Sequence, residues 1–150
     1  MNAASTPMLT SRLGFGCGRL KGGADKAVSL RLVHACLDHG IRYFDTAPPY
    51  GLGASESVLG ESLKGRQESV MVATKAGLAR PASPGLKIAA RSLVKPLARW
   101  VPGLRQAVLK SLALRAPAGN FEIDFIETSF EVSLRQLQRD RVDCLLLHEA

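Results

Sequence analysis

The sequence predicts an α/β fold in which short parallel strands alternate with amphipathic helices. Four short apolar runs recur along the chain, and segments with a helical spacing of apolar residues separate them. Strands separated by helices of this length pair in parallel through right-handed crossovers. Polar side chains lie at or just beyond the ends of three of these runs, and these side chains are Asp45, Tyr50, Lys75 and His148. We therefore expect them at one end of a single sheet.

The first strand and helix are expected within the first 40 residues. Residues 12–17 form a short, glycine-rich strand candidate. Asp25 is placed to cap a helix that extends to about His39, and Gly40 supplies its C-terminal stop. The apolar residues that share one face of this predicted helix are Val28, Leu32, Ala35 and Cys36.

The second and third strands are expected at residues 41–45 and 70–74. Two consecutive prolines, Pro48 and Pro49, prevent the second strand from continuing. A helix opens at Ser55 and covers residues 56–64, and its apolar side consists of Val58, Leu59 and Leu63. The third strand is continuously apolar, as expected for a strand that is covered on both faces.

Residues 79–119 differ in composition from the rest of the chain. They include eight basic residues, no acidic residue and five prolines. The whole chain has a net charge of +7, so this segment alone carries +8 and the remainder carries −1. The basicity therefore belongs to an insertion and not to the fold, and we expect no nucleic-acid partner. Between the prolines, residues 86–96 and 103–115 have the pattern of short amphipathic helices.

The basic residues of the first insertion helix allow two interpretations. Lys87, Arg91 and Lys95 recur every four residues, so a helix presents them on one face. This face is either simply solvated, or it forms a basic lid that attracts an acidic substrate or an anionic surface.

A third core helix and a fourth strand complete the pattern. The helix is expected from about Ile126 to Gln138, and the strand at residues 142–147. The apolar face of the helix consists of Ile126, Phe130, Leu134 and Leu137. The order β-α-β-α-β-(insertion)-α-β, with polar groups at the strand ends, predicts a TIM-type (β/α) barrel of which residues 1–150 supply about four βα units.

Composition excludes several other classes of protein. A hydrophobic fraction of 46% and a charged fraction of 22% are globular values, and no apolar stretch approaches the ~20 residues of a membrane span. The N-terminus lacks the pattern of a secretory signal. Cys17, Cys36 and Cys144 are widely spaced in apolar surroundings, so we expect buried, reduced thiols, no metal site and a cytoplasmic location.

Several motifs together resemble the N-terminal half of the aldo-keto reductases, a family of (β/α)8 barrels that use NAD(P)H. The first reads Gly40-Ile-Arg-Tyr-Phe-Asp-Thr-Ala47, and Tyr50-Gly51 and Glu56-Ser-Val-Leu-Gly60 follow it. The residues that match the family's later segment are Ser133, Leu134, Leu137, Asp143, Leu147 and His148. The joint match covers nearly all of the chain except the insertion.

The resemblance implies a role for each polar side chain. Tyr50 is expected to protonate the carbonyl oxygen as hydride arrives. A phenol is a weak acid, with an ordinary pKa near ~10, and a neighbouring ammonium stabilises its phenolate form. This role is implied for Lys75, which Asp45 is expected to hold charged and oriented. His148 is expected to orient the substrate oxygen. Ordinary structural roles in turns, loops or the core remain the alternative for all four residues.

The resemblance also implies a cofactor and a reaction. Gly16 and Cys17, at the end of the first strand, fall where the family contacts the nicotinamide ribose, and Asp45 adjoins the same place. The expected cofactor is NADP or NAD, and the expected reaction interconverts an aldehyde or ketone, with a sugar as one possibility, and its alcohol. The alternative is a non-catalytic regulatory or binding subunit of the same fold.

The family's other cofactor contacts come from strands that lie beyond Ala150. Three origins of the chain are open, namely a fragment, a split protein and a dimerising half-barrel, and we favour the fragment. The chain alone is expected to bind the cofactor weakly and to show essentially no turnover. It is also expected to expose the apolar faces of residues 70–74 and 142–147, which favours self-association or a molten state.

Overall fold

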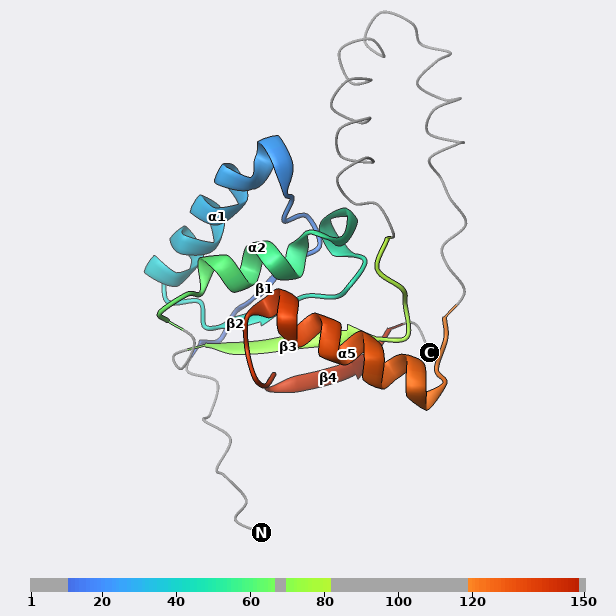
Figure 1. The fold of residues 1–150 in the computed structure, drawn as a ribbon. Coiled ribbons are helices and arrows are strands. Elements are labelled where there is room, and N and C mark those ends of the chain that lie inside the picture. The colour runs from blue at the N-terminus through green and yellow to red at the C-terminus, as the bar shows by residue number, and fades with distance from the viewer. Residues whose placement is uncertain (1–10, 67–69, 82–118, 149–150) are drawn as a thin grey trace, which may run out of the picture.

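A computed structural model of the chain describes residues 11–66, 70–81 and 119–148. These residues contain a parallel sheet with the strand order β1-β2-β3-β4. The strands are β1 (Gly14–Gly16), β2 (Tyr43–Asp45), β3 (Met71–Ala76) and β4 (Cys144–Leu147). The helices α1 (Lys26–Asp38), α2 (Ser55–Ser62) and α5 (Ile123–Leu137) lie side by side along one face of the sheet (Figure 1).

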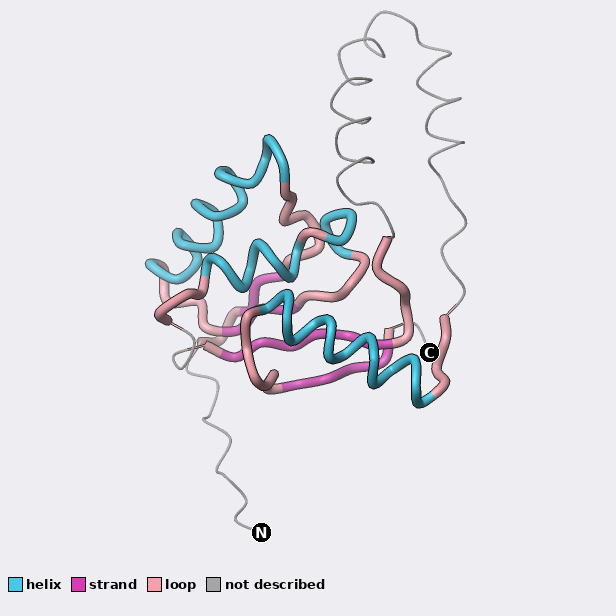
Figure 2. The backbone as a smooth tube through the Cα atoms, in the orientation of Figure 1, coloured by secondary structure: helices cyan, strands magenta, loops and turns pink. Residues whose placement is uncertain are grey.

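The predicted order of elements and the parallel pairing are confirmed. Consecutive strands are neighbours, and Figure 2 shows the helices in one layer and the strands in the other. The register pairs Gly16 with Asp45, and Asp45 with Ala73. Gly16, Asp45 and Ala73 therefore lie in one row across the sheet, and β3 continues three residues beyond this row. The row positions the site described below.

Strands β1, β2 and β4 are shorter than predicted. The other differences at β3 and α5 have identifiable reasons. Strand β3 continues two residues past Thr74 because its end pairs with β4, where Lys75 lies beside Leu146 and Ala76 beside Leu147. Helix α5 begins three residues earlier than predicted. The side chain of Asn120 accepts a hydrogen bond from the Glu122 N–H at 3.0 Å, which fixes the turn that leads into this helix.

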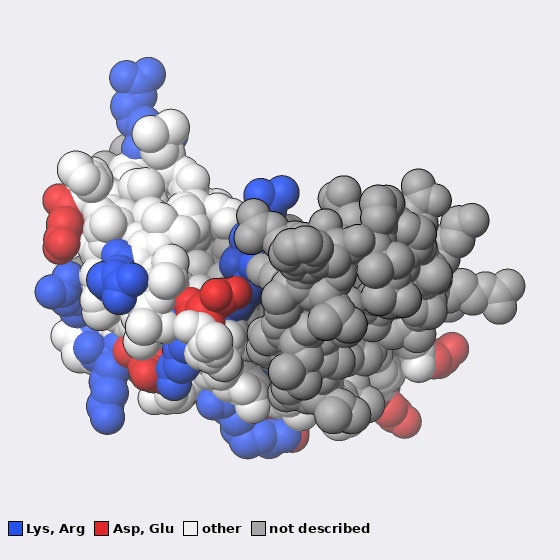
Figure 3. Space-filling model, turned by 90° about the horizontal axis from the view of Figure 1, so that it is seen from above, with Lys and Arg blue, Asp and Glu red and all other residues white. Residues whose placement is uncertain are grey.

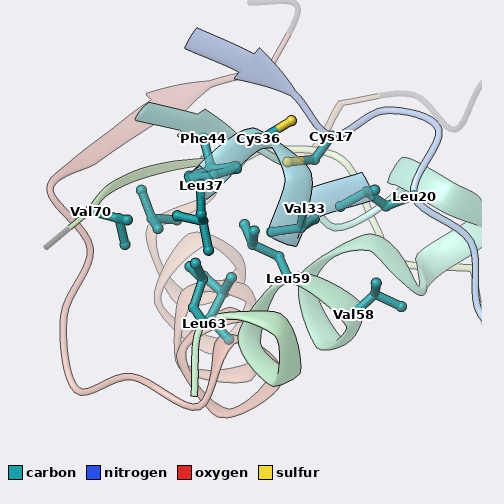
Figure 4. Packing of buried hydrophobic residues seen from close by; sticks show 12 residues of the cluster. Cys17, Leu20, Val33, Cys36, Leu37, Phe44, Val58, Leu59, Leu63 and Val70 are labelled. Carbon is teal, nitrogen blue, oxygen red and sulfur yellow. The ribbon is translucent and has the colours of Figure 1, made fainter. Parts of the chain in front are cut away.

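The core lies between the sheet and the helices (Figure 4). Phe44 of β2 and Val72 of β3 point toward the helices and are fully buried. The predicted apolar side of α2 is confirmed, because Val58, Leu59 and Leu63 are all buried in this cluster. Full burial of side chains of this size stabilises a fold by about 1.5–3 kcal/mol each.

The predicted apolar face of α1 is wrong except at Cys36, which is buried. Val28 and Leu32 are 56% and 47% exposed. The residues of α1 that are buried are Ser29, Val33, Cys36 and Leu37. Ser29 explains the choice of face, because its hydroxyl accepts a hydrogen bond from the Lys21 N–H at 2.9 Å and donates one to the Asp25 carbonyl at 3.2 Å. These bonds turn that side of the helix toward the preceding loop.

Asp25 precedes α1 as predicted, but its side chain does not cap the helix. A short 3-10 turn, η1 (Gly23–Asp25), leads into α1, and Asp25 already has a helical backbone conformation. Its carboxylate instead lies 3.6 Å from the ammonium of Lys21 on the surface. Among the thiols, Cys17 and Cys36 are buried as expected, whereas Cys144 is partly exposed.

The two strands that were expected to expose apolar faces behave differently. In β3, Val72 and Ala73 are fully buried. In β4, the outermost strand of the sheet, the three leucines Leu145, Leu146 and Leu147 are exposed. The prediction of an exposed apolar strand therefore holds for β4 and is wrong for β3.

The two ends of the basic segment meet at its base. The carbonyl of Gly77 accepts a hydrogen bond from the Asn120 N–H at 2.7 Å. The ring of Phe121 lies against both Gly77 and Gly119, where an added Cβ would approach it to 2.4 and 2.6 Å. Both predicted insertion helices, with Lys87, Arg91 and Lys95, lie outside the described residues.

Arg80 belongs to the fold rather than to the insertion, which corrects the interpretation of its charge. Its side chain is 20% exposed and pairs with the fully buried carboxylate of Glu56. On the face seen in Figure 3, basic and acidic side chains intermingle over the described part of the molecule. None of the described helices is long and apolar enough to cross a membrane.

Gly60 sets the distance between α2 and α5. A Cβ at this position would lie 2.5 Å from the carbonyl oxygen of Leu137 and 2.8 Å from that of Gln136. Both atoms belong to backbone, so a side-chain rotation cannot relieve the contact. The absence of a side chain at Gly60 therefore allows α2 to approach the C-terminal end of α5.

We expect Gly60→Ala to destabilise the fold. In an exposed helix, this replacement stabilises by about 0.5–1 kcal/mol. Here the sign reverses, because the methyl group pushes two backbones apart at a cost of ~1–3 kcal/mol. Urea unfolding measures the difference, and Gly16→Ala is the control because its added Cβ meets no atom within 4 Å. A Gly60→Ala variant as stable as the wild type would contradict the close approach of the helices.

Candidate active site

The register of the sheet brings the predicted polar residues to one end of the strands. Asp45 is the last residue of β2, and it pairs with Ala73 of β3. Lys75 lies two residues beyond Ala73, so it faces the same side of the sheet as Asp45. Tyr50 begins the short turn η2 (Tyr50–Gly53) after β2, and His148 directly follows β4.

Asp45 and Lys75 form an ion pair at this end of the sheet. The Lys75 Nζ lies 2.5 Å from the Asp45 Oδ1 and 3.2 Å from the carbonyl oxygen of Thr46. The Lys75 side chain is only 14% exposed, and that of Asp45 is 31% exposed. Burial lowers the pKa of Lys75, but its hydrogen bonds with Asp45 and Tyr50 outweigh burial and raise the pKa above the ordinary value. Lys75 is therefore an ammonium at neutral pH.

The rings of Tyr50 and His148 complete the cluster. The Lys75 Nζ lies 4.8 Å from the centroid of the Tyr50 ring. The Tyr50 and His148 rings meet edge to face, with centroids 5.6 Å apart and an angle of 87° between their planes. The backbone N–H of His148 donates to the Ala76 carbonyl at 2.8 Å, which anchors this residue beside β3. The structure thus brings all four side chains together, while their chemical roles stay predictions.

The two other predicted site residues differ in accessibility. Gly16 is exposed at the end of β1, beside Asp45. Cys17 has no exposed surface, and its backbone N–H donates to the Asp45 carbonyl at 2.8 Å. Burial, followed by the nearby Asp45 charge, raises the pKa of the Cys17 thiol, so the thiol stays protonated. Cys17 supports the site from inside, and Gly16 borders it.

A layer of buried hydroxyl groups beneath the site was not identified from the sequence. The Ser55 hydroxyl, in the first turn of α2, donates to the Cys17 carbonyl at 2.9 Å. It also lies 3.0 Å from the hydroxyl of Thr46, which follows Asp45. All three residues are fully buried. Ser55 therefore links the segments that follow β1 and β2.

Glu56, the next residue of α2, makes a second buried connection. Its Oε1 accepts a hydrogen bond from the Thr74 hydroxyl at 2.6 Å, and its other oxygen pairs with Arg80. Arg80 also donates from Nη1 to the Gly53 carbonyl at 2.6 Å. The sequence pattern indicates Glu56 only as the start of a helix and part of a motif. A buried charge requires a partner, but nothing in the sequence pattern pointed to Arg80.

The turn that carries Tyr50 has an unusual backbone. Gly51 and Leu52 are both left-handed, with φ values of 59° and 61°. Gly51 is required there, since an added Cβ would lie 1.8 Å from the Leu20 carbonyl oxygen. For Leu52, a positive φ is uncommon. This turn therefore depends on its surroundings to keep its shape.

These features define the class of the protein: a parallel βα sheet of the TIM-barrel type that gathers polar groups at the carboxyl ends of its strands. Within that class, the model of the Aldo/keto reductase family matches residues 12–150. The chain belongs to this family.

Known members place the chain among bacterial relatives. It is 30% identical over 149 residues to pyridoxal 4-dehydrogenase of Microbacterium luteolum, a match that covers 96% of this chain and 41% of the relative. It is 33% identical over 120 residues to the NADH-specific methylglyoxal reductase of Escherichia coli (strain K12), covering 72% of this chain and 35% of the relative.

A solved structure agrees with this assignment. The aldo-keto reductase AKR11C1 from Bacillus halodurans, in its holo form, superposes with a TM-score of 0.64 at 28% identity. That match covers 91% of this chain and 35% of the other. The chain thus spans roughly a third to two fifths of the length of these three proteins. Within the part of the chain that the structure describes, no group of three or more His, Cys, Asp or Glu side chains is arranged to hold a metal ion.

We expect Asp45→Asn to lower the pKa of Lys75 relative to the wild type. Burial of the ammonium remains in this variant, and only the interaction with Tyr50 is left to oppose it. An NMR titration of the Lys75 side chain measures this directly. Asp25→Asn is the control, because it removes a surface carboxylate that pairs with Lys21. An unchanged Lys75 pKa in Asp45→Asn would contradict the ion pair.

The same ion pair predicts a pH dependence of stability. The folded pKa of Lys75 is raised, so the charge contributes its full stabilisation below the ordinary lysine pKa. The wild type loses this contribution as the pH rises through the raised pKa. In Asp45→Asn we expect a smaller alkaline loss at this site, because the largest cause of the raised pKa is removed. Urea unfolding at a series of alkaline pH values, with Asp25→Asn alongside, compares the two variants.

Proposed function

We propose that this chain supplies the acid–base groups of an NAD(P)-dependent oxidoreductase that interconverts a small aldehyde or ketone and its alcohol. The observation that carries the proposal is the convergence of Asp45, Lys75, Tyr50 and His148 at the carboxyl ends of the strands. The names of two relatives, pyridoxal 4-dehydrogenase and methylglyoxal reductase, support carbonyl chemistry of this kind.

Tyr50 is the proposed general acid. In the reduction, its phenol gives a proton to the carbonyl oxygen, and negative charge develops on the phenol oxygen. The Lys75 ammonium, 4.8 Å from the ring centroid, stabilises that charge. Asp45 keeps the ammonium protonated and points it toward Tyr50. In the oxidation, the Tyr50 phenolate accepts the proton of the alcohol hydroxyl, which reverses this step.

His148 is the proposed group that orients the substrate. Its ring lies edge to face against the ring of Tyr50, with the two centroids 5.6 Å apart. An imidazole at this position is suited to hydrogen-bond the substrate oxygen and to hold it near the phenol. Positioning of this kind supplies a large part of the rate enhancement of many enzymes.

The residues at the ends of β1 and β2 fit a nicotinamide cofactor. Gly16 borders open space, in which an added Cβ would meet no atom within 4 Å. The Asp45 side chain is partly exposed, and its ion pair with Lys75 uses Oδ1. We propose that Gly16 and Asp45 contact the ribose of NADP or NAD, with Cys17 supporting them from the core. When bound, the nicotinamide supplies or accepts the hydride.

Tyr50→Phe tests the proposed function most directly. The assay uses a polypeptide that carries residues 1–150 together with the remaining strands of a barrel. The substitution removes only the hydroxyl group, so we expect kcat to fall by ~10²–10⁴-fold while the cofactor still binds. Turnover is measured from NAD(P)H absorbance, and cofactor affinity from fluorescence titration.

Tyr43→Phe is the matched control, because Tyr43 is the other tyrosine of the chain and lies at the start of β2. We expect this variant to retain turnover. Turnover by Tyr50→Phe at the wild-type rate would refute the general-acid assignment. Loss of turnover in both tyrosine variants would indicate a general effect on the fold instead.

A further inference from the structure

We infer that Arg80 is a positioning residue for Tyr50, because it ties the turn that carries Tyr50 to the strand that carries Lys75. The effect of Arg80 on catalysis rests on the proposed function. The physical link between the two segments does not, since it follows from the hydrogen bonds of Arg80, Glu56 and Thr74.

The guanidinium bridges two acceptors that belong to successive elements. Its Nη1 donates to the carbonyl of Gly53 at 2.6 Å, and Gly53 is the last residue of η2, the turn that Tyr50 begins. Its Nη2 pairs with the carboxylate of Glu56 in the first turn of α2. Arg80 thus holds the end of the Tyr50 turn against the start of the next helix.

Glu56 extends this link to the strand of Lys75. The hydroxyl of Thr74 donates to the Glu56 Oε1 at 2.6 Å, and Thr74 directly precedes Lys75 in β3. Thr74 and Glu56 are both fully buried, so water does not compete for these bonds. The contacts therefore form a continuous path from the Tyr50 turn, through Arg80 and Glu56, to the backbone that carries Lys75.

The Tyr50 turn needs such a restraint. Leu52, which follows the left-handed Gly51, is itself left-handed, and a residue other than glycine keeps this conformation only when neighbouring groups enforce it. On one side, the Gly51 N–H donates to the Gly18 carbonyl at 3.2 Å. On the other side, Arg80 holds Gly53. Without Arg80, the turn relaxes and the phenol moves relative to the Lys75 ammonium.

Arginine is the residue type that suits this task. A planar guanidinium offers several donors in a fixed arrangement, so it bonds a carboxylate and a carbonyl at the same time. A lysine at this position keeps a positive charge beside Glu56, but its single ammonium does not hold both acceptors in the same geometry. Arg80→Lys therefore separates the positioning role from the neutralisation of a buried charge.

The test uses the chain as it stands, with tyrosines labelled with ¹³C. The chain has two tyrosines, so the ring signals of Tyr50 are read against those of Tyr43 in the same spectrum. We expect Arg80→Lys and Arg80→Met to shift or broaden the Tyr50 signals and to leave those of Tyr43 in place. Arg135→Lys is the matched control, since Arg135 is exposed and pairs with Glu131 within α5.

A kinetic measurement complements the spectra. In a polypeptide that carries these residues within a complete barrel, Arg80→Lys is expected to lower kcat by up to ~10²-fold, because a displacement of about 1 Å in a catalytic group has effects of this size. The KM for the cofactor is expected to stay unchanged, since the hydrogen bonds of Arg80 go to Gly53 and Glu56 and not to the residues proposed to contact the cofactor.

Unchanged Tyr50 signals in Arg80→Lys overturn the inference, whatever the stability of that variant. Arg80→Lys keeps the positive charge beside Glu56. If this variant unfolds, the inference is also overturned, because Arg80 is then required for the stability of the whole fold. If Arg80→Met unfolds, Arg80→Lys alone decides. A displaced Tyr50 signal combined with full activity of Tyr50→Phe supports the positioning role of Arg80 and refutes the proposed function, so the two failures are distinguishable.

Discussion

The first turn of α2 holds the carboxyl ends of three strands together. Its two adjacent polar residues, Ser55 and Glu56, are both fully buried. Ser55 hydrogen-bonds the segments that follow β1 and β2, and Glu56 hydrogen-bonds β3. An unsatisfied buried polar group costs about 1–3 kcal/mol, so each bond strongly favours a single arrangement of the strand ends. The distances within the site depend on this arrangement.

An ion pair holds the N-terminal end of α2, and close packing holds its C-terminal end. At the N-terminus, the Glu56 side chain pairs with Arg80 and lies at the positive end of the helix dipole. Near the C-terminus, Gly60 allows close contact with the backbone of α5. A helix held in this way rotates and slides little, and the side chains at its start stay aligned with the strands below.

The sequence predicted the order of the elements, because hydrophobic periodicity is visible in short stretches of sequence. It also predicted that the four polar side chains meet, because parallel strands place their carboxyl ends at the same edge of a sheet. It did not predict the buried side of α1, since apolar residues occupy both sides of that helix. It also missed the pair of Glu56 and Arg80. These two residues are far apart in the sequence, and a single ion pair leaves no periodic signal. For the same reason, Arg80 was grouped with the basic residues that follow it.

The hydrogen bond between Gly77 and Asn120 has a consequence for changes in the length of the basic segment. It joins the two ends of the basic segment, while Arg80 fastens the chain just inside that junction. The cost of closing a loop grows only slowly with its length, and here the closure is made by residues of the fold itself. A change in the length of the segment between these anchors is therefore expected to cost the fold little.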